Sequence, residues 1–132
     1  MKIFTYGVFD LLHKGHIDLL WEVREMADEL KAQMIVGVFT DKVAESFKRK
    51  PVMNIKERID AIEALRIANK IVEQHELSPN YLINILEIDK IVKGPGADYE
   101  TIKVPCEKIL LDYHGKISTS EIIKRIKLRE DL

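Results

Sequence analysis

The chain has 132 residues, of which 46% are hydrophobic and 33% are charged, with 21 Lys and Arg against 22 Asp and Glu. This near-neutral balance argues against nucleic acid as a main partner. The single cysteine, Cys106, excludes an internal disulfide or a cysteine-based zinc cluster and fits a reducing compartment. No apolar run reaches the roughly 18–20 residues of a membrane span, and Met1 leads directly into a predicted strand, so we expect a cytoplasmic protein.

The first predicted unit is a strand, a glycine turn and a helix. Residues 2–6 form a short apolar run, and residues 16–31 place apolar side chains three and four apart, as in a helix with one core face. These helical positions are Ile17, Leu20, Trp21, Val23, Met26, Ala27 and Leu30. His13 and His16 lie at the helix entrance, three residues apart, where both could hold one anion. The turn therefore predicts a phosphate-binding site.

Strand and helix patterns alternate along the rest of the chain. The predicted strands are 34–39, 70–73, 88–93 and 108–111, and the predicted helices are 41–47, 55–69, 79–86 and one from 119 onward. Thr40, Asn54 with Glu57, and Ser118 with Glu121 supply helix caps. We expect a single Rossmann-like α/β domain over residues 1–132, with a parallel sheet of about five strands in the order 3-2-1-4-5. The loops at 7–16, 46–51, 94–98 and 113–120 follow strands and should meet at one sheet edge.

Each chemical feature has an ordinary structural explanation when it stands alone. The histidine pair can cap a helix, the basic loop 48–50 can be solvated surface, and Ser118 with Thr119 can be a helix cap. Together with Arg58 they supply the parts of a nucleoside triphosphate site. No side-chain nucleophile stands out, so direct nucleotidyl transfer fits, in which a substrate phosphate attacks the α-phosphorus and pyrophosphate leaves.

Other nucleotide sites and metal sites have less support. The chain contains neither GxxxxGK[ST] nor GxGxxG, which disfavours a P-loop NTPase and a dinucleotide dehydrogenase. Asp10 is the nearest third ligand for a metal bound by the two histidines, and structural zinc is disfavoured for lack of further ligands. We predict no metal site formed by protein side chains.

Three stretches resemble the cytidylyltransferases of the HxGH nucleotidyltransferase superfamily. Residues 7–16, Gly-Val-Phe-Asp-Leu-Leu-His-Lys-Gly-His, are similar to the GxFDxxHxGH motif of that family. Residues 47–58 resemble its lysine-then-Glu-Arg segment, and residues 117–123 resemble the end of its RTEGISTS motif. The short length is most like the bacterial glycerol-3-phosphate cytidylyltransferases.

The resemblance implies an enzyme that transfers CMP from CTP to a phosphorylated small alcohol, glycerol 3-phosphate first, with Mg²⁺ on the nucleotide and a homodimeric assembly. It implies that His13, His16 and Lys48 are catalytic. The nucleotide-binding residues that it implies are Gly7, Val8, Phe9, Asp10, Gly15, Arg58, Lys93, Gly94, Ile117, Ser118 and Thr119.

Two stretches depart from the cytidylyltransferase pattern. Residues 113–116, Tyr-His-Gly-Lys, stand where the family has Arg-Thr-Glu-Gly, and residues 92–99 are closer to the VKGxDY stretch of heptose-phosphate adenylyltransferases. Adenylyl transfer to a sugar phosphate or to flavin mononucleotide therefore stays open. A nucleotide-binding module without turnover is the alternative from another class.

Overall fold

The computed structural model describes residues 1–94, 103–112 and 117–132. Its elements are β1 (Lys2–Gly7), α1 (Lys14–Glu29), β2 (Gln33–Phe39), α2 (Asp41–Phe47), α3 (Ile55–Ala64), β3 (Lys70–Gln74), α4 (Asn80–Leu86), β4 (Lys90–Lys93), β5 (Glu107–Leu110) and α5 (Thr119–Lys127). Every strand and helix that the sequence predicts is present, and the differences concern where each begins and ends.

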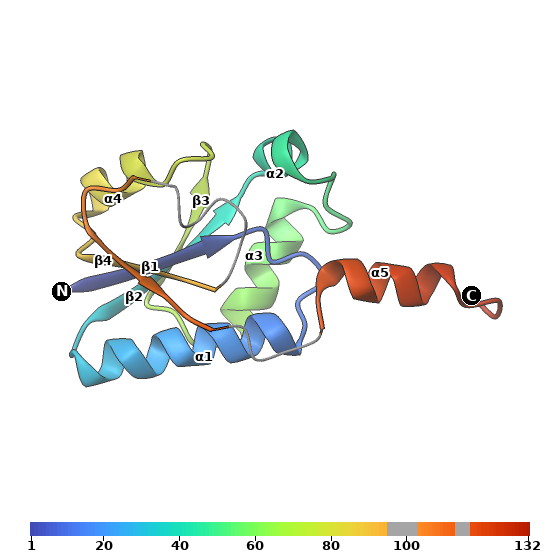
Figure 1. Ribbon diagram of the computed structural model, residues 1–132, viewed down its shortest axis with the longest axis horizontal. Coiled ribbons are helices and arrows are strands. Elements are labelled where there is room, and N and C mark those ends of the chain that lie inside the picture. The colour runs from blue at the N-terminus through green and yellow to red at the C-terminus, as the bar shows by residue number, and fades with distance from the viewer. Residues whose placement is uncertain (95–102, 113–116) are drawn as a thin grey trace.

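The strands form one parallel sheet in the order β3-β2-β1-β4-β5, which confirms the predicted order (Figure 1). The central strand β1 pairs with β2 from Lys2↔Gln33 to Gly7↔Val38, and with β4 at Ile3↔Lys90. The chain therefore leaves β1 toward β2 and later returns to its other side at β4. In such sheets the ligand site lies beyond the carboxyl end of the strands at this switch point.

Helices cover both faces of the sheet, because neighbouring residues of a strand point to opposite sides. Ile3 packs in one core with residues of α1 and α3, and Phe4 packs in a second core with residues of α2 and α4. Both side chains are fully buried. The central strands β1 and β2 are buried on both faces, as their near-continuous apolar residues predict, whereas the edge strands β3 and β5 are more exposed.

The predicted caps of α2, α3 and α5 are present. Thr40 Oγ1 accepts the amide N–H of Val43, and Ser118 Oγ accepts that of Glu121. At α3 the capping box is complete, because Asn54 and Glu57 each accept the backbone N–H of the other. These bonds satisfy amide groups that have no acceptor within the helix.

The predicted ends of two helices were wrong. Helix α1 begins at Lys14 rather than 16 and ends at Glu29 rather than 31. Helix α3 ends at Ala64, well before Asn69, because Arg66 adopts a left-handed backbone with φ 51°. Asn69 instead accepts the backbone N–H of Met34 and so joins the start of β3 to β2.

The core face of α1 is narrower than predicted. Leu20, Val23 and Ala27 are buried along one line of the helix, whereas Trp21 is 49% exposed and Leu30 is 41% exposed. Trp21 follows Leu20 by one residue, which turns it about 100° away around the helix. An apolar residue in a helical pattern is therefore not always on the core face.

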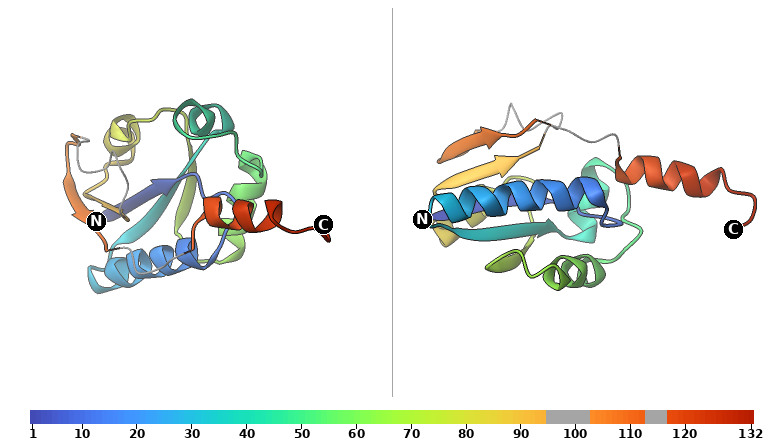
Figure 2. Two further views of the ribbon diagram at one scale, coloured as in Figure 1. Left: turned by 45° about the vertical axis from the view of Figure 1, so that its right-hand side comes forward. Right: turned by 90° about the horizontal axis from the view of Figure 1, so that it is seen from below.

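Helix α5 extends away from the rest of the molecule, as Figures 1 and 2 show. Thr119 in its first turn is its buried residue, and Ile126 near its end is 49% exposed. Within residues 1–94, 103–112 and 117–132, no helix combines the length and apolar character that a membrane span requires.

Replacing Gly37 in β2 by alanine should destabilise the fold. A Cβ there would lie 2.5 Å from Cζ of Phe4 and 2.9 Å from Oε1 of Gln74, both of them buried. We expect a loss of about 1–3 kcal/mol in the free energy of unfolding, measured by urea denaturation. The control is Gly94→Ala, whose Cβ, among residues 1–94, 103–112 and 117–132, would meet only Leu19, at 3.7 Å. Equal stability of the two variants would contradict this packing.

Candidate active site

The loop between β1 and α1 contains two residues in left-handed backbone. Phe9 has φ 55° and Leu11 has φ 50°, and among the described glycines none has a positive φ. Such a conformation costs a non-glycine residue roughly 1–3 kcal/mol and persists only when its surroundings fix it. The strain therefore falls on Phe9 and Leu11, whereas the glycines of the motif supply space.

The two histidines lie against each other at the start of α1. Their ring centroids are 3.8 Å apart and nearly parallel. His13 is the N-cap, and its Nδ1 accepts the backbone N–H of Gly15 at 3.0 Å. Nδ1 of His16 accepts the backbone N–H of His13 at 3.3 Å. The helix cap thus uses one nitrogen of each imidazole.

Each imidazole accepts through Nδ1, so its Nε2 carries the proton in the neutral form. Burial lowers the pKa of His13, and the charge of Lys48 lowers it further. Burial, and then the charges of His13 and Lys48, lower the pKa of His16 to about 3. Nε2 of His13 is buried and has no hydrogen-bond partner within residues 1–94, 103–112 and 117–132. A buried N–H donor without an acceptor suits a ligand oxygen.

Gly15 is required by the closeness of its neighbours. A Cβ at this position would lie 2.9 Å from Cε1 of His13 and 3.3 Å from the carbonyl oxygen of Ile117. Gly7 is less restricted, because its Cβ would meet the ring of Phe9 at 3.3 Å. The ring of Phe9 in turn packs edge-on against His16, with centroids 5.5 Å apart. Gly15 therefore leaves room for the ring of His13, and Phe9 packs against the ring of His16.

Asp10 joins three segments of the site. Its buried carboxylate accepts the backbone N–H groups of Val52 at 2.8 Å and Met53 at 2.9 Å. Its carbonyl oxygen accepts the hydroxyl of Thr119 at 2.8 Å. Asp10 thus ties the loop after β1 to the loop before α3 and to the first turn of α5.

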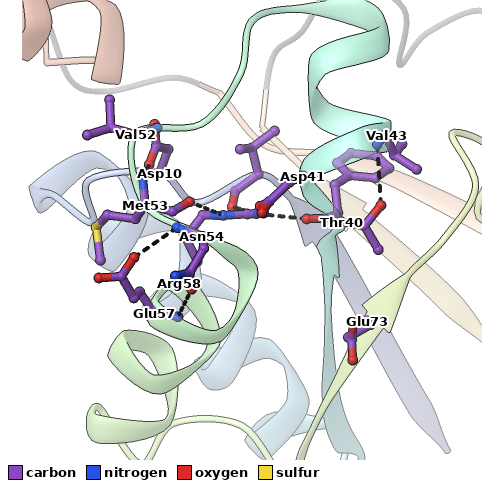
Figure 3. A network of polar contacts seen from close by, with 12 residues as sticks. Asp10, Thr40, Asp41, Val43, Val52, Met53, Asn54, Glu57, Arg58 and Glu73 are labelled. Carbon is purple, nitrogen blue, oxygen red and sulfur yellow. Dashed lines mark hydrogen bonds and ion pairs between the residues drawn. The ribbon is translucent and has the colours of Figure 1, made fainter.

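Arg58 is enclosed in a network of polar contacts with neighbouring segments (Figure 3). Its fully buried guanidinium donates to the carbonyl oxygens of Met53, Val8 and Phe39 and forms an ion pair with Asp41 at 2.6 Å. The predicted contact with the nucleotide is corrected here, because this side chain is enclosed and its donors serve the protein. Val8 likewise contributes its carbonyl oxygen to this network.

Lys48 lies beside the histidines, at the C-terminal end of α2. Desolvation lowers the pKa of its ammonium group, the charge of Arg49 lowers it further, and the carboxylate of Asp10 raises it. The charge of Lys48 also lowers the pKa of both histidines. The structure therefore places this lysine close to Asp10 and the histidine pair.

The first turn of α5 gives Ser118 and Thr119 different positions. Ser118 is exposed and its oxygen caps the helix, which leaves its hydroxyl hydrogen available to a ligand. The hydroxyl hydrogen of Thr119 is donated to the carbonyl oxygen of Asp10. Because this contact uses the hydroxyl of Thr119, the predicted binding of nucleotide by Thr119 stays a prediction that would involve its backbone N–H at the start of α5.

Lys93 contacts the end of β1. Its Nζ donates to the carbonyl oxygen of Tyr6 and lies 4.1 Å from the centroid of the Tyr6 ring. Burial lowers the pKa of Lys93 to about 8. Gly94 follows, beside Leu19 of α1. Of the two stretches that depart from the cytidylyltransferase pattern, residues 95–99 of the first (92–99) and all of the second (113–116) lie outside the described residues.

Sequence patterning missed two residues of this edge. Arg49, which it grouped with solvated surface, donates from Nη1 to Ser120 Oγ at 3.0 Å. Asp41, which was predicted only to begin α2, is the ion-pair partner of Arg58. Asp41 comes soon after β2, and Arg49 comes directly after Lys48, so their positions in the sequence could have indicated a role at this edge. Charged residues are common in exposed loops, however, and the pattern alone did not single these two out.

The described residues offer no metal centre of their own, since no group of three or more His, Cys, Asp or Glu side chains among them could hold an ion. The carboxylate of Asp10, the predicted nearest third ligand, already accepts two backbone amides. A groove of about 750 Å³ is lined by residues 60–71 at the opposite end of the sheet and contains neither histidine.

Comparison with known proteins identifies one family over most of the chain. The cytidylyltransferase-like family matches residues 4–125. The bifunctional protein HldE of Helicobacter pylori (strain P12) is 35% identical over 132 residues, which cover 95% of this chain and 27% of that protein. Ethanolamine-phosphate cytidylyltransferase of Dictyostelium discoideum is 34% identical, covering 97% of this chain and 37% of that protein.

Two further similarities involve proteins of closer length. D-beta-D-heptose 1-phosphate adenylyltransferase of Bordetella bronchiseptica is 36% identical over 106 residues, covering 76% of this chain and 61% of that protein. The crystal structure of the lipopolysaccharide core biosynthesis protein from Thermoplasma volcanium superposes with a TM-score of 0.74 at 20% identity, covering 87% of this chain and 98% of that one. That structural similarity supports the fold.

Replacing Arg58 by lysine should destabilise the protein, because an ammonium group cannot reproduce the planar fork that contacts four groups. We expect a loss of about 3 kcal/mol in the free energy of unfolding, measured by urea denaturation. The matched control is Arg125→Lys on the exposed side of α5, which should change stability by less than about 0.5 kcal/mol. An Arg58→Lys variant as stable as this control would restore a surface role for Arg58.

The folded protein lowers the pKa of His16 from its ordinary value of 6.5 to about 3. The imidazole should therefore stay neutral as the pH falls through this interval. The unfolded chain takes up this proton near pH 6.5, so the free energy of unfolding should decrease as the pH falls through the interval. Nitrogen-15 spectra of the ring should show the Nε2–H form there. In His16→Gln, which keeps a capping-box residue, this part of the pH dependence should be lost. An imidazolium spectrum at the upper end of the interval would contradict the prediction.

Proposed function

The chain belongs to the cytidylyltransferase-like family, and on this basis we propose that it transfers CMP from CTP to a phosphorylated small alcohol, yielding a CDP-alcohol and pyrophosphate. Glycerol 3-phosphate is the first acceptor to test. The observation that carries the proposal is the pair of neutral imidazoles with Nε2–H donors, next to Lys48 at the switch point of the sheet.

The proposed reaction needs no nucleophilic side chain. A phosphate oxygen of the acceptor forms a bond to the α-phosphorus of CTP, and the bond from that phosphorus to the oxygen bridging to the β-phosphorus breaks. Pyrophosphate then carries away the electron pair of the broken bond. Charge develops on phosphate oxygens during this step, and fixed donors stabilise it.

In this proposal His13 and His16 donate from Nε2 to oxygens at the reacting end of the triphosphate. Lys48 supplies positive charge to the same oxygens, and the first turn of α5 faces the terminal phosphates. The network of Asp10 and Arg58 holds the loops in place, since both act on backbone groups. Hydrogen bonds hold the two histidines, Asp10 and Arg58 in place before substrate arrives, which lowers the cost of reorganisation.

Magnesium and a second subunit complete the proposal. Because Asp10 is committed to backbone amides, the ion would enter bound mainly to triphosphate oxygens, where it neutralises charge. The homodimer that the resemblance implies is retained as a proposal. The ethanolamine-phosphate cytidylyltransferase among the relatives supports a phospho-alcohol acceptor.

Adenylyl transfer is the second candidate. It is supported by the residues 92–99 that resemble heptose-phosphate adenylyltransferases and by the heptose 1-phosphate adenylyltransferase among the relatives. In this candidate the histidines and Lys48 keep the same roles, and ATP replaces CTP. Thermal shifts with each nucleotide separate the two, because stabilisation by ATP alone would reject cytidylyl transfer.

Replacing His16 by glutamine should reduce the rate of pyrophosphate release at least about 100-fold, because a preorganised donor to the developing charge is displaced. The assay uses all four nucleoside triphosphates with a panel of phospho-alcohols, sugar phosphates and flavin mononucleotide. Glutamine keeps the capping box, so the fold should survive.

His75→Gln is the matched control, since His75 is exposed in the loop after β3 and should leave the rate unchanged. Full activity in His16→Gln would refute the assignment of the site. Nucleotide binding without pyrophosphate from any pair of substrates would refute turnover and favour a binding module.

A further inference from the structure

Arg49 is a cation at the site to which the proposed mechanism gives no role. Its Nη1 donates to Ser120 Oγ in the first turn of α5 at 3.0 Å, so it joins the loop after α2 to that helix. It lines a small pocket of about 20 Å³ together with Val8, Asp10 and Lys48. Arg49 therefore lies between Lys48 and Asp10 on one side and the first turn of α5 on the other.

The guanidinium of Arg49 retains unused hydrogen-bonding capacity. Its Nε is buried and has no hydrogen-bond partner among residues 1–94, 103–112 and 117–132, and none of the ion pairs found in that part of the chain involves Arg49. A guanidinium offers five N–H donors in one plane. Buried donors of a charged group without acceptors are costly, so this arrangement favours an incoming anion.

The surroundings of Arg49 carry excess positive charge. Lys48 lies close enough that the charge of Arg49 lowers its pKa. The nearby carboxylate of Asp10 is already bound to the amides of Val52 and Met53. The N-terminal end of α5 adds partial positive charge beside Ser120. Because like charges held together repel, a polyanion that contacts both side chains would relieve the repulsion.

We propose that Arg49 binds the terminal phosphates of the nucleoside triphosphate, the two that leave as pyrophosphate, while Ser120 positions its guanidinium beside the start of α5. The planar fork of arginine contacts two phosphate oxygens at once, which a lysine cannot do. This inference deepens the proposed nucleotidyl transfer and rests on it. It gives Arg49 and Lys48 different phosphates, because the proposed function places Lys48 at the α-phosphate.

The test measures binding of inorganic tripolyphosphate, CTP and CMP to the full chain by calorimetry, at about 0.15 M salt so that long-range charge effects are screened. In Arg49→Met the affinity for tripolyphosphate and CTP should fall about 10- to 100-fold, and the affinity for CMP should stay within about twofold. Arg49→Lys should recover only part of the loss. Circular dichroism checks that each variant is folded, and Arg49→Gln serves if the methionine variant is not.

Two further variants test whether the loss of affinity in Arg49→Met comes from the contact between Arg49 and Ser120. Arg125→Met removes the same charge from the exposed face of α5 and should leave all three affinities unchanged. Ser120→Ala should weaken CTP binding by several-fold and have no additional effect in the Arg49→Met background, because both act through one contact.

The outcomes distinguish this inference from the proposed function. Equal losses for CTP and CMP in Arg49→Met, or unchanged CTP binding, would overturn the assignment of Arg49 even in an active enzyme. Loss of tripolyphosphate binding in Arg49→Met would support it. A chain that shows this loss but releases no pyrophosphate with any substrate pair would refute the proposed function alone.

Discussion

The guanidinium of Arg58 fixes the relative positions of the segments that form the active-site edge. It is fully buried and contacts the loop after β1 through Val8, the end of β2 through Phe39, and the loop before α3 through Met53. A buried charge is costly unless it is paired and hydrogen-bonded, and Asp41 supplies the counter-charge. Val8, whose carbonyl oxygen accepts from Arg58, directly precedes Phe9, the first left-handed residue of the loop that leads to the histidines.

The site combines neutral donors with neighbouring cations. Nδ1 of each histidine is used by the helix cap, which sets the tautomer and directs Nε2–H outward from the cap. The two explanations of the histidine pair, capping and ligand binding, therefore apply to the same side chains at different nitrogens. Burial and the charge of Lys48 lower the pKa of both rings, which favours neutral imidazoles beside this cation.

Helix α5 is coupled to the site through its first turn. The hydroxyl of Thr119 binds the carbonyl of Asp10, and Ser120 accepts from Arg49, whereas most of the helix extends into solvent. The first turn of α5 is therefore held by Asp10 and Arg49, and Asp10 itself belongs to the loop after β1. Contacts of a bound triphosphate at this turn would act on the position of α5 and on the loop together.

General rules for parallel sheets predict the strand order and the edge where the loops meet once the alternation of strands and helices is known, and the sequence by itself determined that alternation. Local patterns carry this information, because the apolar period, the caps at Thr40, Asn54 and Ser118, and the histidine motif each lie within a few neighbouring residues. Only the tertiary structure decided that Arg58 is enclosed, that the Thr119 hydroxyl is donated to Asp10 and that Arg49 faces α5. Arginine and threonine fit a buried network or a phosphate site equally well, and the choice depends on which distant backbone carbonyls fold around them.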